Sequence, residues 1–262
     1  MESGKVEPYI RLLVWEAIVP LRTSASDSAE QSSQLFFGEQ ALLLEEQPNW
    51  YRLRRLRDGY EGWADAKMFY PLADSDTLSI SPPTSFSLGG HLLREDGSLM
   101  ALPIGPPLPI EVQTGIFNWA GEKLEATKSL RTTAVRPSSE WVATATLFMN
   151  APYLWGGISN WGIDCSGLMQ TSAAMCGITL PRDSSQQAEC GVAIEYGKQQ
   201  AGDLAFFAKP NKKKITHVGL LRDSESIIHA SGRVRIDRLS PQGIVHSQNQ
   251  QITHHLISIR RC

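Results

Sequence analysis

The segment Pro152-Tyr-Leu-Trp-Gly-Gly-Ile-Ser-Asn-Trp-Gly-Ile-Asp-Cys-Ser-Gly-Leu168 places a cysteine directly after a loop rich in glycine and tryptophan. Residues that could face a core recur at helical spacing after Cys165, at Leu168, Ser172, Met175 and Cys176. This spacing predicts a helix that begins near Cys165. A thiol at the start of a helix meets the positive end of the helix dipole, which favours the thiolate. Since the thiolate is the nucleophilic form, Cys165 is a candidate catalytic nucleophile.

Two histidines follow on a predicted β-hairpin. Residues 216–221 and 226–231 have the composition of strands, and the polar residues between them have that of a turn. With the turn centred near Ser224, His217 and His229 are diagonal neighbours on one face of the hairpin. Such neighbours lie roughly 7–8 Å apart at the backbone, so their rings can meet and one can orient the other. A register slip of one residue would break this arrangement.

These segments together resemble a known family. Over roughly residues 134–262 the chain is similar to the NlpC-type family of papain-like cysteine peptidases, which cut bacterial cell-wall peptides. The motifs that carry the similarity are Tyr153-Leu-Trp-Gly-Gly157, Asp164-Cys-Ser-Gly-Leu168, Pro181-Arg-Asp-Ser-Ser-Gln186, His217-Val-Gly219 and Ile228-His-Ala230. The resemblance implies a papain-like α+β fold for this part of the chain.

The resemblance also implies a role for each reactive side chain. Cys165 would be the nucleophile, His217 the general base and His229 the residue that orients the base, while Tyr153 would help to form the oxyanion hole. A zinc site made of the same cysteine and histidines is the alternative, although no C-x-x-C or H-E-x-x-H spacing supports it. We therefore expect neither a metal nor a cofactor.

The other cysteines and histidines have no comparable surroundings. A lone cysteine is most often a small buried apolar residue, and this is the interpretation for Cys176, Cys190 and Cys262. His254 and His255 are adjacent on a predicted strand, so they point to opposite faces. They cannot easily share one site, and we interpret them as ordinary strand residues.

The composition sets wide bounds on function and location. A chain of 262 residues can hold one large domain or two to three small ones, and its net charge of −2 gives no reason to expect nucleic acid or an anionic membrane as a partner. The basic cluster at residues 209–214 is interpreted as a solvated loop. The N-terminus lacks the pattern of a signal peptide, and no stretch approaches the roughly 20 apolar residues of a membrane span. Four cysteines do not make a disulfide framework, so a cytoplasmic protein is expected. The oligomeric state is left open.

The N-terminal part predicts a run of short strands. Proline, asparagine and glycine separate the strand-like pieces, and Asp58-Gly59 is a hairpin signal. This part resembles a bacterial SH3-like domain through Val19-Pro-Leu-Arg22, Phe37-Gly-Glu39, Asn49-Trp-Tyr-Arg-Leu53 and Asp58-Gly-Tyr-Glu-Gly-Trp63. We therefore predict an SH3-like barrel over residues 1–72 and a divergent second barrel over residues 73–133. The expected architecture is an α+β papain-like catalytic domain at residues 134–262, preceded by two small all-β SH3-like barrels.

The entry to the catalytic domain has the signature of a helix start. Serines follow Pro137 and could cap a helix, and Trp141, Ala145 and Phe148 form an apolar face. Strands are predicted at 203–208, 216–222, 226–231, 232–239 and 254–261. A nucleophile at a helix start facing this sheet is consistent with the α+β fold.

Relatives with two barrels suggest a substrate. The resemblance implies a cytoplasmic enzyme that trims recycled cell-wall peptides at the bond between γ-linked D-Glu and a diamino acid, when L-Ala has a free amine. Tyr60, Glu30 and Asp183 match residues that hold this amine, and a buried ammonium needs such anionic or acceptor partners. Matches to residues around the γ-D-Glu and the rest of the peptide are Asp164, Ser166, Ser184 and Trp155. The expected partner is L-Ala-γ-D-Glu-diamino acid, with lysine and meso-diaminopimelate both open.

Two further functions fit the same residues. An amidase or acyltransferase on this scaffold would use the same cysteine and histidine, because the pair serves any acyl transfer. A cell-wall peptide-binding protein without activity is the non-enzymatic alternative. The intact Cys165, His217 and His229 argue against a pure binder and favour a hydrolase.

Overall fold

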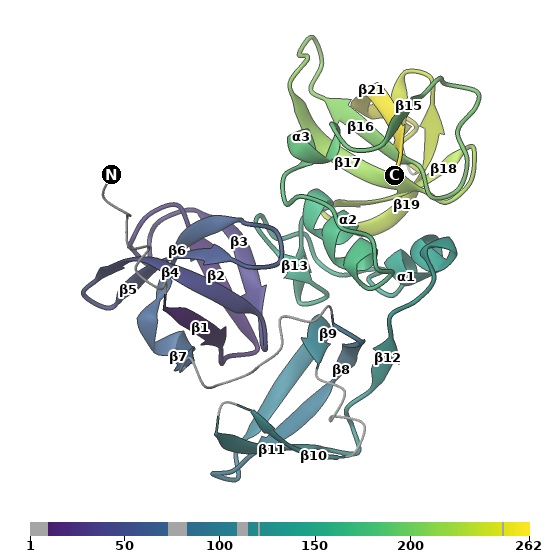
Figure 1. Ribbon diagram of the computed structural model, residues 1–262. Coiled ribbons are helices and arrows are strands. Elements are labelled where there is room, and N and C mark those ends of the chain that lie inside the picture. Colours follow the sequence, from purple (N-terminus) through teal and green to yellow (C-terminus); the bar gives the residue numbers. More distant parts are fainter. Residues whose placement is uncertain (1–9, 73–82, 109–114, 120, 248) are drawn as a thin grey trace, which may run out of the picture. The chain divides into compact units, whose positions relative to one another are not determined.

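The computed structural model describes residues 10–72, 83–108, 115–119, 121–247 and 249–262 (Figure 1). It divides into two compact units. Unit 1 contains Met1–Thr84, Gly89–Leu102 and Pro106–Leu130, and unit 2 contains Ser85–Leu88, Pro103–Gly105 and Arg131–Cys262. The division into three domains at residues 72 and 133 stays a prediction, and the first of these boundaries adjoins residues 73–82, which lie outside the described residues.

Unit 1 begins with a seven-stranded antiparallel sheet in the order β3-β2-β6-β5-β4-β1-β7. Alternating side chains of these strands fill one core that includes Leu12, Val19, Leu53 and Ala64. The predicted strands and the turn at Asp58-Gly59 are confirmed. The strands are β1 (Arg11–Val14), β2 (Ile18–Arg22), β3 (Gln31–Phe36), β4 (Gln40–Gln47), β5 (Trp50–Arg55), β6 (Glu61–Asp65) and β7 (Phe69–Leu72), with the 3₁₀ turn η1 (Ala66–Met68) before β7.

A buried ion pair fastens the β5–β6 turn of this sheet. The guanidinium of Arg55 is fully buried and pairs with the carboxylate of Asp58, which also accepts a hydrogen bond from the Tyr60 N–H. Although burial acts to raise it, this guanidinium lowers the pKa of Asp58 to about 2. The pair therefore fixes the backbone that carries Tyr60.

A second, smaller sheet follows in the order β10-β11-β8-β12, with β9 paired to β8. Its strands are β8 (Ser85–Arg94), β9 (Leu99–Leu108), β10 (Ile116–Trp119), β11 (Glu122–Ala126) and β12 (Thr132–Ala134). The part of it in unit 1 has its own core, which contains Leu92, Leu102, Phe117 and Leu124. Residues 109–114 lie outside the described residues, and a second SH3-like barrel over 73–133 stays a prediction.

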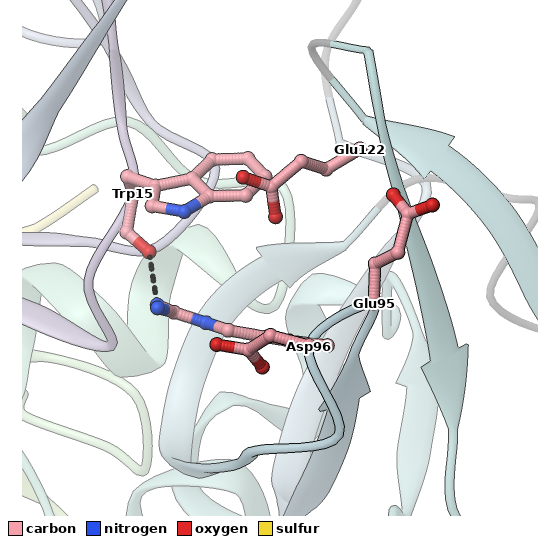
Figure 2. A pocket seen from close by; sticks show the side chains of 5 residues that line it. Trp15, Glu95, Asp96 and Glu122 are labelled. Carbon is pink, nitrogen blue, oxygen red and sulfur yellow. Dashed lines mark hydrogen bonds between the residues drawn. The ribbon is translucent and has the colours of Figure 1, made fainter.

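A cavity of about 350 Å³ lies within unit 1 and is lined by Trp15, Arg94, Glu95, Asp96 and Glu122 (Figure 2). The guanidinium of Arg94 donates to the Trp15 carbonyl at 3.0 Å and packs 5.8 Å from the centre of its ring. Three carboxylates and one guanidinium thus line the cavity, and this guanidinium also pairs with Glu16 at 3.2 Å.

Unit 2 combines short helices with a seven-stranded sheet in the order β15-β21-β16-β17-β18-β19-β20. The helical elements are η3 (Ser138–Glu140), α1 (Trp141–Thr146), α2 (Cys165–Ala174) and α3 (Ser184–Gln187). A two-stranded ribbon of β13 (Ile158–Ser159) and β14 (Gly162–Ile163) precedes α2. The large sheet contains β15 (Val192–Ile194), β16 (Leu204–Ala208), β17 (Ile215–Leu221), β18 (Ser226–Ser231), β19 (Arg233–Ser240), β20 (Gly243–Val245) and β21 (Ile252–Arg261).

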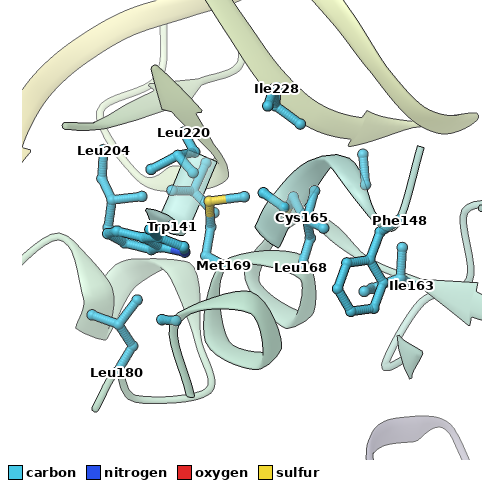
Figure 3. Close-up of a cluster of buried hydrophobic side chains, with 14 of the residues drawn as sticks. Trp141, Phe148, Ile163, Cys165, Leu168, Met169, Leu180, Leu204, Leu220 and Ile228 are labelled. Atoms are coloured by element: carbon cyan, nitrogen blue, oxygen red, sulfur yellow. The ribbon is translucent and has the colours of Figure 1, made fainter. Parts of the chain in front are cut away.

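The core of unit 2 lies between α2 and the sheet. Figure 3 shows Leu168 and Met169 of α2 among Leu204, Leu220 and Ile228 of the strands. Burying each of these side chains contributes about 1.5–3 kcal/mol, which holds the start of α2 against β17 and β18. The nucleophile candidate is therefore placed by packing as well as by local sequence.

The predicted helix face before this core is confirmed for Trp141 and Ala145, whereas Phe148 lies beyond the end of α1 at Thr146, and the predicted cap is wrong. Trp141, Ala145 and Phe148 are all buried. No serine side chain caps the helix, because the serines form the 3₁₀ turn Ser138–Glu140 and lie inside the helical segment. The turn closes through the Glu140 N–H, which donates to the Pro137 carbonyl at 2.9 Å.

Across the described parts of the chain, no helix combines the length and the apolar character needed to cross a membrane.

Candidate active site

Helix α2 starts at Cys165 because Asp164 caps it. Asp164 has an extended backbone, and its Oδ1 accepts the Gly167 N–H at 2.7 Å. Its Oδ2 accepts the Gly156 N–H at 2.9 Å. One carboxylate therefore ties the preceding loop to the first turn of the helix and fixes the backbone on both sides of the thiol.

Two glycines let the loop lie against this helix start. A Cβ at Gly157 would collide with the Gly162 carbonyl, and a Cβ at Gly167 would collide with the Gly157 carbonyl. Both obstacles are backbone atoms, which cannot move aside cheaply. The glycines of the two motifs around Cys165 are thus required by close backbone approach.

Arg182 completes the support of Asp164. Its Nη1 donates to Asp164 Oδ1 at 3.1 Å and to Ser166 Oγ at 2.9 Å, and its Nη2 donates to Asp164 Oδ2 at 2.6 Å. All three side chains are buried. The sequence interpretation assigned no role to Arg182, and the parts of Asp164 and Ser166 in substrate binding stay predictions.

The predicted hairpin of the two histidines is confirmed in strands and register. Gly219 pairs with His229 and Leu221 pairs with Ile227, which is the pairing of a turn centred at residue 224. His217 and His229 are diagonal neighbours, and His217 Nε2 lies 2.9 Å from His229 Nδ1. Their rings are nearly perpendicular, at 89°.

A carboxylate that the sequence interpretation missed lies behind His229. Asp237 Oδ2 is 3.0 Å from His229 Nε2 and accepts Arg235 Nε at 2.8 Å. Its Oδ1 accepts the Ser247 N–H at 3.0 Å. A signal for it was present, since Asp237 falls on the predicted strand 232–239 that follows the second histidine.

The interpretation of His254 as an ordinary strand residue is wrong. Its ring stacks on that of His217, with centroids 4.0 Å apart and planes 23° apart. His254 is on β21, which pairs with β16 and β20, and β16 in turn pairs with β17. Such contacts between strands distant in sequence cannot be inferred from alternation along one strand.

Burial sets the protonation states of the site. Burial raises the pKa of the Cys165 thiol to about 12, and Asp164 adds to this, while N–H groups of Val218 and Ser166 lower it. Burial and then His229 hold the pKa of His217 well below its usual value. The resting pair is therefore a neutral thiol and a neutral imidazole, contrary to the thiolate expected from the helix start alone, because burial outweighs the helix terminus.

Tyr153 and Trp155 lie on the exposed side of the loop before α2. Tyr153 donates its N–H to the Gly232 carbonyl at 2.9 Å. Burial raises the pKa of its phenol to about 12, and the charges of Cys165 and Asp164 add to this effect. The phenol thus stays protonated and can donate a hydrogen bond near the thiol. Trp155 is 58% exposed, and its part in substrate binding stays a prediction.

The remaining predicted residues lie in two places. Asp183 and Ser184 are half-buried at the start of α3, in the segment that also carries Arg182. Tyr60 and Glu30 belong to unit 1, on the β5–β6 turn and directly before β3. Contributions of these four residues to substrate binding stay predictions.

The arrangement can perform acyl transfer. The thiol lies against the backbone N–H of Val218, the residue after His217, so the nucleophile is beside the strand that carries the candidate base. A base that is itself hydrogen-bonded to a second histidine has the geometry of a catalytic triad. Among the residues that the structure describes, no group of three or more His, Cys, Asp or Glu side chains is placed to hold a metal ion.

Two family models match this chain. Residues 150–260 match the NlpC/P60 family, and residues 21–67 match the bacterial dipeptidyl-peptidase Sh3 domain. A crystal structure of an NlpC/P60 family protein from Bacillus cereus superposes with a TM-score of 0.78 at 19% identity, over 96% of this chain and 99% of that one. This likeness establishes the fold, while the finer papain-like description stays a prediction.

Two relatives share most of their length with this chain. Gamma-D-glutamyl-L-lysine dipeptidyl-peptidase of Bacillus subtilis is 31% identical over 216 residues, which cover 76% of this chain and 71% of that protein. The protein of the same name from Bacillus cereus is 26% identical over 241 residues, 80% of this chain and 70% of that protein. The chain therefore belongs to the NlpC/P60 family of cysteine peptidases and has an SH3 domain of the bacterial dipeptidyl-peptidase type ahead of its catalytic domain.

Proposed function

We propose that this enzyme hydrolyses the bond between γ-linked D-Glu and a diamino acid in murein peptides that carry a free N-terminal L-Ala, as a step of cell-wall recycling. The observation that carries the proposal is the extent of the similarity. It covers 76% of the chain against a γ-D-glutamyl-L-lysine dipeptidyl-peptidase, more than the catalytic segment 150–260 alone. The match to an SH3 domain of the dipeptidyl-peptidase type supports the same substrate class.

The proposed reaction begins with a coupled proton transfer. His217 takes the thiol proton of Cys165 as the sulfur attacks the γ-carbonyl carbon of D-Glu, forming a C–S bond and a tetrahedral oxyanion. The Tyr153 phenol and backbone N–H groups at the start of α2 donate to this oxyanion. Because the thiol is buried and neutral at rest, its deprotonation is expected to accompany attack rather than precede it.

Three further proton transfers complete the cycle. Protonated His217 gives its proton to the amine of the diamino acid, and the C–N bond breaks to leave a thioester on Cys165. His217 then takes a proton from water, whose oxygen attacks the thioester carbonyl. The C–S bond breaks, His217 returns this proton to the sulfur to regenerate the thiol, and L-Ala-γ-D-Glu leaves. The side chain of His229 orients the base through both half-reactions.

The proposed recognition of a free amine rests on charge. Asp183 and Ser184 lie beside Arg182, in the segment that supports the start of α2. A carboxylate at Asp183 would pair with the L-Ala ammonium, and such a pair is needed because an unpaired buried charge is costly. Tyr60 and Glu30 are proposed as further acceptors for the same amine.

Product analysis tests the function. The peptides L-Ala-γ-D-Glu-L-Lys and its meso-diaminopimelate counterpart are incubated with the wild type, Cys165→Ala and the buried-cysteine control Cys176→Ser. The wild type and the control should release L-Ala-γ-D-Glu and the free diamino acid, while Cys165→Ala should be slower by several orders of magnitude. Cleavage after L-Ala, or transfer to an added amine without hydrolysis, would replace this function by another acyl transfer.

A further inference from the structure

His217, His229 and Asp237 form a diagonal row across three neighbouring strands. They lie on β17, β18 and β19, which are adjacent in the sheet. The pairs Gly219–His229 and Ile227–Asp237 place each group two residues from the position opposite the next. The side chains of His229 and Asp237 are completely buried, and His229 Nε2 lies 3.0 Å from Asp237 Oδ2.

The far end of the row is anchored by donors. Asp237 accepts from the Ser247 N–H and from Arg235 Nε, which approach its two different oxygens. The oxygen that Arg235 contacts is also 3.0 Å from His229 Nε2. Although burial acts to raise it, the hydrogen bonds from His229 and Ser247 lower the pKa of Asp237 to about 2. An ionised carboxylate can only accept hydrogen bonds.

We propose that Asp237 is a positioning residue that fixes the proton positions on both histidines and so presents an unprotonated nitrogen of His217 to the thiol of Cys165. Because Asp237 accepts, His229 Nε2 carries the hydrogen. A neutral His229 then has a bare Nδ1, which accepts the hydrogen of His217 Nε2 at 2.9 Å. A neutral His217 is left with a lone pair on Nδ1, and this is the nitrogen that can take the thiol proton.

The neutral state of both rings follows from their burial. Burial lowers the pKa of His217 and that of His229, and in His229 Asp237 opposes this effect without cancelling it. Without the carboxylate, both tautomers of the pair would be accessible. In the wrong tautomer His217 carries its hydrogen on Nδ1, so an N–H is directed toward Cys165 and no lone pair can take the thiol proton. Asp237 also places a negative charge behind the cation that forms during attack.

The tautomers are measured directly by NMR on the full chain with ¹⁵N-labelled histidine rings and no substrate. We expect His217 and His229 each to carry hydrogen on Nε2 and none on Nδ1, with assignments from single histidine variants. In Asp237→Ala both rings should become tautomer mixtures. An Nδ1–H on either ring of the wild type would overturn the proposal.

Kinetics supply the second measurement, with Asp203→Ala as the matched control. Asp203 is also buried, and its carboxylate pairs with Arg261 at 2.7 Å and accepts the Gln200 N–H. Asp237→Ala should lower kcat about a hundredfold or more with KM within about threefold, whereas Asp203→Ala should change neither tautomers nor kcat. An unchanged kcat in folded Asp237→Ala would overturn the proposal.

A milder variant keeps the test valid if Asp237→Ala does not fold. In Asp237→Asn the amide oxygen can still accept from His229 and Arg235, so the tautomers should persist while the charge is lost. The kcat should then fall about tenfold, which corresponds to roughly 1.4 kcal/mol of transition-state stabilisation. A wild-type kcat in Asp237→Asn would contradict the role of the charge. The proposal rests on the proposed roles of Cys165 and His217, but the NMR result does not depend on which peptide is cleaved.

Discussion

The imidazole rings of His217 and His254 are stacked, with centroids 4.0 Å apart and planes inclined by 23°. His254 Nδ1 lies 2.9 Å from the hydroxyl of Thr253, which fixes the orientation of its ring. Burial lowers the pKa of His254 to about 4, and the neighbouring His229 adds to this. Near neutral pH the general-base candidate is therefore held against a flat, uncharged partner.

The first prediction concerns this stacking. His254→Ala removes the partner and should lower kcat/KM about 2- to 10-fold, because an aromatic pair contributes about 0.5–1.5 kcal/mol. His254→Phe keeps a flat uncharged ring and should stay within about twofold of the wild type. The neighbouring His255→Ala is the control, and an equal loss in both alanine variants would show that the stacking is not responsible.

The second prediction concerns acid stability. His217, His229 and His254 all have a pKa below the usual value of 6.5 in the folded protein, mainly through burial. Below pH 6.5 the unfolded chain binds more protons, so the free energy of unfolding falls as the pH drops. For His254 this loss extends from 6.5 down to about 4, at no more than about 1.4 kcal/mol per pH unit and less where water screens the ring.

Urea unfolding at pH 7.0, 6.0 and 5.0 measures this loss. His254→Phe should be less sensitive to acid than the wild type, because one of the three groups is gone. His91→Asn, which changes an exposed histidine, should keep the wild-type slope. The prediction is wrong if His254→Phe and the wild type lose stability in parallel.

How far the sequence predicts this site depends on how local each contact is. The pair His217–His229 follows from one hairpin whose turn is visible in the sequence, and the register was predicted correctly. The position of Asp237 behind His229 can be predicted in the same way from the next hairpin, in which Ser231 pairs with Arg233 across Gly232. Gly232 marks the turn of this second hairpin in the sequence, and it would place Asp237 behind His229.

Other parts of the site depend on tertiary structure. The place of His254 is set by pairings of β21 that shift register, between Phe206 and Phe207 on one side and between Ile244 and Val245 on the other. A shift of this kind changes which side chains share a face, and nothing in the sequence marks it. The neutral state of Cys165 likewise depends on burial by the folded sheet, which outweighs the local effect of a helix start.

The third prediction concerns the buried pair Arg182–Asp164. Arg182→Met leaves a buried carboxylate without its cation and should destabilise the protein by about 3–5 kcal/mol. In Asp164→Asn/Arg182→Met the carboxylate charge is also removed. The double variant should therefore lose less free energy of unfolding than the two single variants lose together. Urea unfolding of all four proteins measures the coupling, with the exposed Arg238→Met as the control. Additive losses would show that the two groups do not stabilise each other.

The last prediction concerns the free amine of the substrate. If Asp183 pairs with the L-Ala ammonium, acetylating that amine removes the cation of this pair, at a cost of several kcal/mol. Cleavage of N-acetyl-L-Ala-γ-D-Glu-L-Lys should then be at least about a thousandfold slower than that of the free tripeptide, which corresponds to roughly 4 kcal/mol.

Acetylating the lysine side chain instead is the matched control, since it removes a cation elsewhere in the same peptide. In Asp183→Asn the two rates should approach each other, while Glu189→Gln, which changes an exposed carboxylate nearby, should keep the wild-type ratio. Intact murein, whose L-Ala amine is blocked, should resist for the same reason. Equal rates on free and N-acetylated peptides would refute the selection for a free amine and favour an enzyme that cuts the assembled wall.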